Sequence, residues 1–383
     1  MKRNVLNTIC CPHCRADLKV LSVVKRTEEH IIDGVLECER CGARFPILGK
    51  IPRLVKMDLL AESERQALHV FCDQKHPHVE IISEAYISTS ERYARIEKMV
   101  RSKIRTDLLL SDRLQERAEH DIQYKVYDTE KKEKFIRTLN PFLTVPPRRI
   151  VEIGGGQGGL IGTLREYYQP ELAMLIDLDA AWTEVALLRD PNTEVVRADA
   201  TQLPIKDGAC DVMISTSTLE HISDWRSVIK EMVRISTRGF LSYGPNGFFP
   251  YDIGHLDAPL VTFLPKKYAA LFAHLWHILM RTGRSLDSIK EELNSVSYIP
   301  RPVVTRELSK NGAKVKNVFG EFLYHSVNSD YHYYAEGLKV FLKRHQGVLK
   351  VLSKTMVCLA MEPMVYLVYE SPCKNKRVSR ENR

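Results

Sequence analysis

The sequence predicts a doubly wound α/β domain with a mostly parallel, seven-stranded sheet, preceded by a small metal-binding ribbon. Three observations lead to this fold class. Between residues 149 and 369, short apolar runs alternate with runs of helical periodicity, which is typical of a parallel sheet with helices on both faces. A glycine-rich loop directly follows the first apolar run. Residues 1–55 contain two C-x-x-C pairs, a spacing typical of a metal site.

The expected elements follow this alternation in order. Strands are expected at residues 149–153, 173–176, 194–197, 211–215, 240–243, 315–319 and 364–369, and helices near 158–168, 180–189, 225–236 and 303–311. An aromatic and proline-rich insertion at about 247–300 interrupts the alternation, and its apolar residues recur at helical spacing over 264–281. That segment is either a lid helix packed on the sheet or a helix that faces a lipid surface.

The rest of the chain divides by composition. We expect a ribbon at 1–55, a charged helical linker or lid region at 56–140, the α/β domain at 141–372 and a disordered basic tail at 373–383. Hydrophobic residues make up 44% of the 383 residues and charged residues 27%, which argues against global disorder. The net charge of +8 permits an acidic partner such as RNA without requiring one.

Two absences from the sequence bear on location. No apolar stretch reaches the roughly 20 residues that a membrane-spanning helix needs. No signal-peptide pattern is visible, and the nine cysteines do not form a disulfide framework. Reduced thiols without a signal peptide predict a cytoplasmic protein.

The glycine loop at residues 154–159 is the first candidate site. Its glycines allow a sharp turn and a close approach of a ligand, and the helix that follows favours negative charge at its start. Gly154, Gly156 and Gly159 alone also satisfy a dinucleotide fingerprint, so the glycine spacing is ambiguous. Glu152, two residues before the loop, would repel a pyrophosphate. Its carboxylate suits the positively charged methionine end of S-adenosylmethionine.

Acidic residues also close the next two strands. Asp177 follows an apolar run and can accept both ribose hydroxyls, a role that NAD enzymes share. Asp199, followed by Ala200, ends the third strand, where an acid can accept the exocyclic amine of adenine. Ser215 ends the fourth strand at the same edge of the predicted sheet. NAD proteins have no requirement for an acid at position 199, so S-adenosylmethionine is the better prediction.

Taken together, these residues resemble the class I S-adenosylmethionine-dependent methyltransferases, particularly the ubiquinone and menaquinone methyltransferase branch. The resemblance covers residues 145–246 well and 300–370 loosely; Gly155 departs from it, because that family often has Cys or Ser there. It implies a Rossmann-like methyltransferase domain. The residues predicted to bind the cofactor are Glu152, Gly154, Gly156, Gly158, Asp177, Asp199, Ala200 and Ser215.

Catalytic groups should lie beyond the carboxyl ends of the fourth and fifth strands. His221, in a Leu-Glu-His run, is the first candidate for a general base because its pKa lies near neutrality; alternatively it only caps a loop and lines the cofactor site. His255 and Asp257, in the insertion, are further candidates, or else turn and capping residues. The Ser-Thr-Ser-Thr run after the fourth strand disfavours adenine-N6 and glutamine acceptors, whose enzymes carry an Asn-Pro-Pro-Tyr type motif there.

In the ribbon, four thiols are predicted to hold a structural zinc ion. Cys11, Cys14, Cys38 and Cys41 stand in two C-x-x-C pairs, which suit a closed tetrahedral site; a redox pair is the alternative, and Cys10 or His13 could compete as a ligand. With the Phe-Pro-Ile and Gly-Lys-Ile-Pro runs after the second pair, the segment resembles the zinc-ribbon activator subunit of tRNA and release-factor methyltransferases. That resemblance implies a possible protein partner.

The sequence therefore favours a methyltransferase that acts on oxygen or carbon of a small or lipid-linked metabolite. An RNA base methyltransferase is one alternative, because a family of ribosomal RNA methyltransferases also joins a zinc ribbon to this fold. A non-catalytic adaptor is the other. The complete glycine loop with Asp177 and Asp199 argues against the adaptor.

Overall fold

The computed structural model describes residues 1–74, 79–82, 88–102, 130–143, 145–328 and 336–372. The predicted basic tail at 373–383 lies outside these ranges, as does the middle of the predicted helical region.

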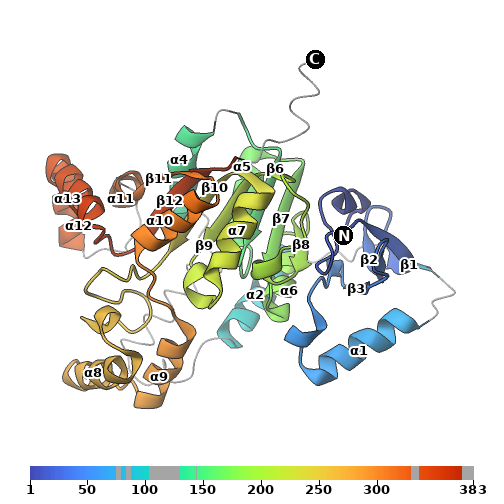
Figure 1. Cartoon of the computed structure of the whole chain (residues 1–383), viewed down its shortest axis with the longest axis horizontal. Coiled ribbons are helices and arrows are strands. Elements are labelled where there is room, and N and C mark those ends of the chain that lie inside the picture. Colours follow the sequence, from blue (N-terminus) through green and yellow to red (C-terminus); the bar gives the residue numbers. More distant parts are fainter. Residues whose placement is uncertain (75–78, 83–87, 103–129, 144, 329–335, 373–383) are drawn as a thin grey trace.

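A seven-stranded sheet organises the larger part of the described chain (Figure 1). Its strand order is β11-β12-β10-β9-β6-β7-β8. Neighbours from β10 to β8 run parallel, and β12 runs antiparallel to both β10 and β11. The predicted fold class is confirmed. The strands are β6 Arg149–Ile153, β7 Leu172–Asp177, β8 Glu194–Arg197, β9 Cys210–Thr216, β10 Ser236–Tyr243, β11 Lys314–Asn317 and β12 Val365–Glu370.

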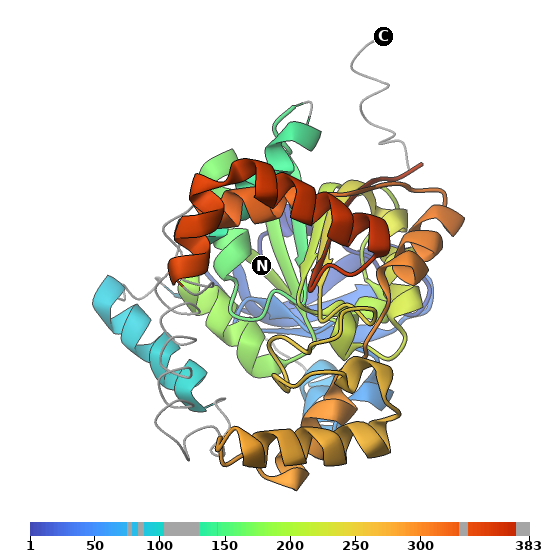
Figure 2. The same ribbon diagram turned by 90° about the vertical axis from the view of Figure 1, so that its left-hand side faces the viewer.

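Helices cover both faces of this sheet. Successive side chains of a strand point to opposite faces, so Ile150 packs in one apolar core and Val151 in the other. The core around Ile150 includes side chains from α4, α5, α11, α12 and α13, and the red helices cross this face in Figure 2. The helices of the domain are α4 Glu130–Leu139, α5 Gly159–Tyr168, α6 Ala180–Arg189, α7 Trp225–Ile235, α10 Arg301–Lys310, α11 Phe319–Asn328, α12 Glu336–Arg344 and α13 Gln346–Leu359.

The ribbon has its own sheet, in the order β4-β3-β2-β1-β5. It packs beside β8, the edge strand of the large sheet (Figure 1). The backbone N–H of Leu54 donates to the carbonyl of Arg197 at 2.9 Å, and Ile9 forms a bridge with Ile205. The ribbon therefore covers an edge that would otherwise expose unpaired backbone groups. Its elements are η1 Arg3–Asn7, β1 Leu18–Arg26, β2 Ile31–Cys38, β3 Arg44–Leu48, β4 Ile51–Pro52 and β5 Glu80–Ile81.

The two parts share one apolar core. Buried Ile9 and Leu54 of the ribbon belong to the same cluster as Val196, Leu203 and Ile205 beside β8. Two ion pairs also join the parts. Nη2 of Arg15 lies 2.8 Å from Oε1 of Glu231, and Nζ of Lys206 lies 2.6 Å from Oδ1 of Asp17. Because the core is continuous, ribbon and sheet should stabilise one another.

Where it is described, the region between the ribbon and the large sheet is mostly helical, apart from β5, which pairs with β1 of the ribbon. It contains η2 Met57–Leu59, α1 Glu62–Asp73, α2 Thr89–Ser102, α4 and η5 Asn140–Phe142. Ile96 and Val100 of α2 pack on Val185 of α6. Glu64 of α1 pairs with Arg197, whose Nε also donates to the carbonyl of Leu178 at 2.9 Å. This region is thus tied to the carboxyl ends of β7 and β8.

The insertion after β10 forms η8 Val261–Phe263, α8 Lys266–Leu279 and α9 Leu286–Ser295, with a small core of its own. Helix α8 buries small or polar side chains, Ala269, Ala273 and His277, against that core. Its larger apolar side chains face outward: Leu271, Leu275, Ile278 and Leu279 are between 54% and 73% exposed. In the part of the chain that is described, no helix is long and apolar enough to cross a bilayer.

Candidate cofactor and acceptor site

The glycine loop joins β6 to α5 at the carboxyl edge of the sheet. Gly154, Gly156 and Gly158 all have positive φ, at 63°, 52° and 73°, which side chains other than glycine rarely adopt. A Cβ on Gly154 would also come within 2.2 Å of the Thr218 side chain. Position 154 therefore requires glycine, both because its φ is positive and because a side chain there would collide with Thr218.

Glu152 lies beneath this loop rather than in it. Its side chain is 2% exposed, and its Oε2 accepts a hydrogen bond of 2.9 Å from the backbone N–H of Ile161 in α5. Burial raises the pKa of Glu152 to about 8, although the hydrogen bond from Ile161 and the charge of Lys132 oppose this rise. Near neutral pH the group is therefore largely protonated, and a nearby positive charge would favour its ionised form.

Asp177 braces the loop from the end of β7. Its Oδ2 accepts from the backbone N–H of Gly156 at 3.0 Å and its Oδ1 from that of Asp179 at 2.9 Å. Burial raises its pKa, and these backbone hydrogen bonds oppose the rise. Each carboxylate oxygen keeps a further lone pair for a ligand hydroxyl.

Asp199 and Ser215 close the neighbouring strands. Asp199 begins η6 (Ala200–Gln202), and its two oxygens accept from the N–H and the hydroxyl of Thr201, at 2.9 and 2.6 Å. Ala200 is buried beside it. The Ser215 hydroxyl is buried and, among the residues described, has no hydrogen-bond partner. Such an orphaned hydroxyl beside the loop suits a ligand or water that completes its bonding.

Two of the predicted catalytic residues come together, with Glu220 as a third member. The rings of His221 and His255 are 5.4 Å apart, and Glu220, His221 and His255 can each place a ligand-type atom within 4.8 Å of the others. Glu220 and His221 belong to η7 (Leu219–His221) after β9, whereas His255 comes from the insertion. Thr218, the residue before η7, donates to the carbonyl of Gly154 at 3.2 Å. The trio therefore lies beside the glycine loop.

The environment of these groups shifts their protonation. Burial raises the pKa of Glu220 to about 7, and desolvation lowers the pKa of His221. For His255, desolvation lowers the pKa, but the Asp252 carboxylate outweighs it and the net shift is upward. Near neutral pH, His221 is thus the imidazole more suited to accept a proton.

Asp257, the third predicted catalytic residue, lies in the same loop as His255 but points elsewhere. Its backbone has a φ of 51°, and its Oδ1 accepts from the N–H of Gly254 at 3.2 Å. Its carbonyl accepts from the hydroxyl of Tyr251 and the indole N–H of Trp276. These contacts are those of a turn residue.

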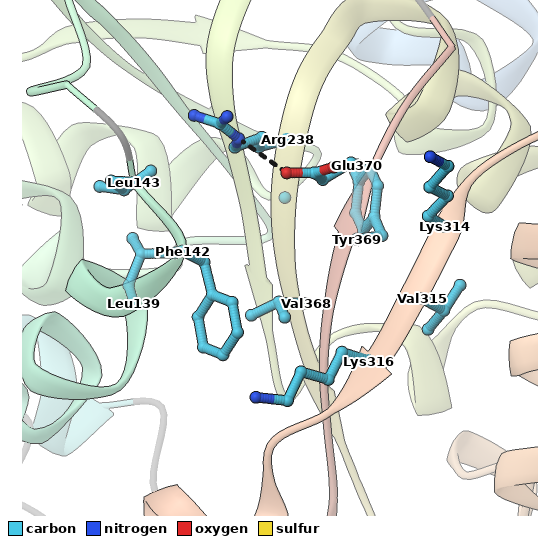
Figure 3. A pocket seen from close by; sticks show the side chains of 11 residues that line it. Leu139, Phe142, Leu143, Arg238, Lys314, Val315, Lys316, Val368, Tyr369 and Glu370 are labelled. Atoms are coloured by element: carbon cyan, nitrogen blue, oxygen red, sulfur yellow. Dashed lines mark hydrogen bonds and ion pairs between the residues drawn. The ribbon is translucent and has the colours of Figure 1, made fainter.

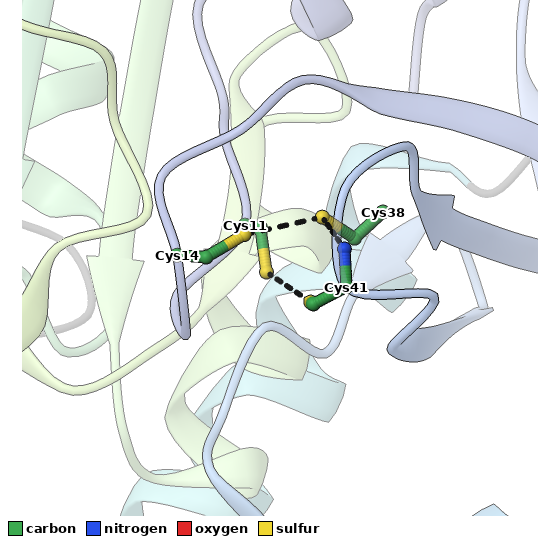
Figure 4. Close-up of side chains that lie close together, drawn as sticks. All are labelled: Cys11, Cys14, Cys38 and Cys41. Atoms are coloured by element: carbon green, nitrogen blue, oxygen red, sulfur yellow. Dashed lines mark hydrogen bonds between the residues drawn. The ribbon is translucent and has the colours of Figure 1, made fainter.

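In the ribbon, the four predicted cysteines form one cluster (Figure 4). The Sγ atoms of Cys11 and Cys41 are 3.7 Å apart, and those of Cys14 and Cys38 are 3.4 Å apart. A tetrahedral zinc ion with bonds of about 2.3 Å separates its sulfur ligands by about 3.8 Å. The cluster therefore fits zinc, and four protein ligands leave no position for a substrate.

A separate cavity of about 230 Å³ lies elsewhere (Figure 3). Leu139, Phe142, Val368 and the Arg238–Glu370 ion pair line it. Arg238 stands near the amino end of β10, so the cavity opens at the opposite edge of the sheet from the glycine loop. It is distinct from the predicted site.

Several residues of the site carried no sequence signal. Lys132 reaches the glycine loop from α4, where a Cβ on Gly159 would come within 2.4 Å of its Nζ. Asp252 orients His255 but stands in an unremarkable Tyr-Asp-Ile-Gly run. Thr218 is one of four hydroxyl residues in sequence, and only its contact with Gly154 distinguishes it.

The sheet order, the glycine loop and the carboxylates at the ends of β6, β7 and β8 define the class I methyltransferase fold. Residues 151–241 match the family model described as a methyltransferase domain, and residues 2–48 match the model described as Trm112p-like protein. The chain therefore joins a Trm112p-like domain to a methyltransferase domain, and both predicted resemblances are confirmed.

Curated relatives match only part of this chain. A malonyl-[acyl-carrier protein] O-methyltransferase of Geobacter sulfurreducens is 30% identical over 180 residues, covering 46% of this chain and 60% of the relative. A similar enzyme of a Marinomonas species is 30% identical over 93 residues, or 24% of this chain and 34% of the relative. A phthiotriol/phenolphthiotriol dimycocerosates methyltransferase of Mycobacterium tuberculosis is 27% identical over 106 residues, or 27% and 37%. The chain thus spans between a third and three fifths of these relatives.

Solved structures resemble it more distantly. Geranyl diphosphate C-methyltransferase from Streptomyces coelicolor aligns with a TM-score of 0.36 and 12% identity, over 63% of this chain and 74% of that one. A complex containing the Haloferax volcanii Trm112 methyltransferase activator aligns with a TM-score of 0.38 and 10% identity, over 65% and 92%.

Proposed function

We propose that this protein transfers the methyl group of S-adenosylmethionine to oxygen or carbon of a small or lipid-linked acceptor. The observation that carries the proposal is the glycine loop, braced by Asp177 and with the buried Glu152 beneath it. An acceptor lone pair attacks the methyl carbon, the S–C bond breaks, and its electron pair stays on sulfur to give S-adenosylhomocysteine. The enzyme's main task is to align the two reactants.

The cofactor is held, in this proposal, along the carboxyl edge of the sheet. Asp177 binds the ribose hydroxyls, Asp199 with Ala200 meets the adenine, and Glu152 acts on the charged methionine end. The glycines at 154, 156 and 158 let the backbone approach the cofactor, and the orphaned hydroxyl of Ser215 supports a contact at the end of β9.

The acceptor is proposed to meet His221 and His255. The lowered pKa of His221 supports a role in removing an acceptor proton, and its nearness to His255 supports a shared site. For Asp257, the hydrogen bond with Gly254 supports the alternative that it holds the turn that carries His255.

Changing His221 to alanine should lower kcat about 100-fold while leaving the affinity for S-adenosylmethionine within twofold.

The pH dependence of cofactor binding tests the role of Glu152. Its pKa of about 8 in the free protein means that it must release a proton when the cofactor's ammonium group stabilises its ionised form. We therefore expect affinity for S-adenosylmethionine to rise between pH 6 and 7.5, by up to about tenfold per pH unit. Calorimetry in buffers of different ionisation enthalpy should show the released proton.

Two variants complete this test. Glu152→Gln should bind more weakly and lose the rise with pH, whereas Glu166→Gln, an exposed position on α5, should behave like the original protein. A rise with pH that survives in Glu152→Gln would mean that another group releases the proton.

A lipid-linked acceptor is supported by the outward apolar face of α8. Four large side chains, Leu271, Leu275, Ile278 and Leu279, are exposed there, with Lys266, Lys267 and Arg281 near the helix ends. An apolar helix face flanked by cations suits the surface of a lipid or an anionic membrane. Relatives named for acyl-carrier-protein and dimycocerosate substrates are in keeping with an acceptor that carries a long chain.

The acceptor class can be identified directly. The protein is incubated with methyl-labelled S-adenosylmethionine and a cell extract, which is then separated into small-molecule, lipid, RNA and protein fractions. We expect label in the small-molecule or lipid fraction. Label confined to RNA would instead support an RNA base methyltransferase, and no label together with no cofactor binding would support the adaptor.

The proposal includes the organisation of the chain. We take residues 1–55 as the ribbon, 56–140 as the linker or lid, 141–372 as the methyltransferase domain and 373–383 as a tail. The contacts of the ribbon with β8 support a role in stabilising its own catalytic domain; a protein partner would have to bind another surface of the ribbon. A cytoplasmic location is proposed from the cysteines, none of which forms a disulfide in the part of the chain that is described.

A further inference from the structure

The trio of Glu220, His221 and His255 has the composition of a metal site. Two imidazoles and one carboxylate bring their ligand-type atoms within 4.8 Å of one another. This set is shared by catalytic zinc sites and by non-haem iron sites, which keep positions open for a substrate. Because His255 comes from the insertion, the trio forms only when the insertion folds over the ends of β9 and β10.

Glu220 supplies a second observation that points to a ligand. Its side chain is 1% exposed, and one oxygen accepts from the N–H of Gly244 at 3.3 Å. The other oxygen, Oε2, is buried and has no hydrogen-bond partner among the described residues. A buried carboxylate oxygen without a partner is costly, and a bound cation would satisfy it.

The rings of both histidines face an oxygen acceptor on their Nδ1 side, His221 at hydrogen-bond distance and His255 at a longer ion-pair distance. A ligating ring commonly donates its other N–H to a backbone carbonyl or a carboxylate, which fixes the tautomer. The Nδ1 of His221 lies 3.0 Å from the carbonyl of Ser295, and the Nδ1 of His255 lies 3.6 Å from Oδ1 of Asp252. A proton on Nδ1 of His221 leaves the lone pair of that ring on Nε2, and the Asp252 carboxylate favours the same tautomer of His255.

The side chain of Asp252 is held in place by hydrogen bonds of its own. It is fully buried, and its Oδ2 accepts from the backbone N–H of Leu256 at 3.1 Å and from the hydroxyl of Tyr298 at 2.7 Å. Its other oxygen, Oδ1, faces Nδ1 of His255. The insertion thus contributes one ligand together with the residues that orient it.

We propose that Glu220, His221 and His255 bind a divalent transition-metal ion that coordinates an oxygen of the methyl acceptor. The inference rests on the proposed methyltransferase function and narrows its acceptor to an oxygen-bearing group that can chelate, such as an acidic hydroxyl or a carboxylate. In this arrangement His221 acts as a ligand rather than as the general base proposed above, because the ion takes the lone pair of its ring, and a hydroxyl bound to the ion loses its proton to water more readily. Its oxygen then bonds to the methyl carbon as the S–C bond breaks and the electron pair passes to sulfur. The ion is unchanged.

Cobalt(II) is the probe for this site. The full-length protein, with zinc in its ribbon, is titrated with Co²⁺ while heat and visible absorption are recorded and the zinc content is followed. We expect one further ion to bind with an absorption spectrum that lacks thiolate charge-transfer bands, because its ligands are nitrogen and oxygen. Retained zinc would exclude exchange into the cysteine cluster.

Ligand variants decide between this site and adventitious binding. Glu220→Gln and His255→Ala should each weaken Co²⁺ binding at least about tenfold. His69→Ala, which removes an exposed histidine of α1, should bind as the original protein does. Because Glu220 is buried and its variant can fail to fold, the partly exposed His255 provides the independent test.

Two results would overturn the inference. One is that the zinc-loaded protein takes up no Co²⁺, and the other is that His255→Ala and His69→Ala bind Co²⁺ with equal affinity. Binding of S-adenosylmethionine is measured on the same samples. Cofactor binding without Co²⁺ uptake would reject the metal site and leave the methyltransferase proposal standing. Co²⁺ uptake that depends on the trio, without cofactor binding, would reject the methyltransferase instead.

Discussion

Replacing Asp177 with alanine should weaken binding of S-adenosylmethionine at least about 100-fold. The carboxylate is proposed to accept the ribose hydroxyls, and hydrogen bonds to a charged group contribute about 1.5–3 kcal/mol each. The change also removes the acceptor for the Gly156 N–H, so the glycine loop loses its brace. Equilibrium dialysis with labelled cofactor measures the loss.

A neighbouring aspartate provides the control. Asp179 lies two residues further on, and its carboxylate accepts from the backbone N–H groups of Ala181 and Trp182 to cap α6. Asp179→Ala should therefore lose about 1 kcal/mol of stability, as expected for an N-cap, but keep its affinity within about threefold. Equal affinity in Asp177→Ala and the original protein would place the ribose elsewhere.

Replacing Cys11 with serine should release zinc and unfold the ribbon. The thiolate is one of four that hold the ion, and a small ribbon depends on its metal for folding. Because ribbon and sheet share one apolar core, we expect the melting temperature of the whole protein to fall by several degrees. Zinc content by mass spectrometry and thermal unfolding measure the two effects.

The adjacent cysteine is the matched control for this change. Cys10 is equally buried but lies outside the cluster, and its backbone N–H donates to the carbonyl of Pro204. Cys10→Ser should keep its zinc and lose only about 1 kcal/mol, the scale of a buried polar substitution. Loss of zinc in both variants would contradict the assignment of ligands.

The sequence predicts the strands of the large sheet well because strands covered on both faces are nearly continuous apolar runs. β10 is an instructive exception. It was expected at residues 240–243 but begins at Ser236, since its first residues, Ser-Thr-Arg-Gly, carry no apolar pattern. Their strand conformation comes from pairing with β9 on one side and β12 on the other.

Helix α8 shows what the periodicity of apolar residues does not predict. The sequence indicates an amphipathic helix, but periodicity does not say which face is buried. Small Ala269 and Ala273 pack inward, whereas the larger Leu271 and Leu275 face outward. The insertion packs closely enough to select small side chains, which only the three-dimensional arrangement reveals.

The candidate site also combines residues that the sequence predicts with contacts that it does not predict. Residues at strand ends, such as Glu152 and Asp177, are predictable because parallel strands bring their carboxyl ends to one edge. The pairing of His221 with His255 and the orientation of His255 by Asp252 depend on how the insertion folds back. No local pattern encodes that fold. The contact of Leu54 with Arg197 is hidden from the sequence for the same reason.

Titration of the intact protein with S-adenosylmethionine in a calorimeter tests the central claim most directly. The account predicts saturable binding of one cofactor per chain, with S-adenosylhomocysteine competing for the same site. The absence of any binding by the zinc-loaded, folded protein would contradict it.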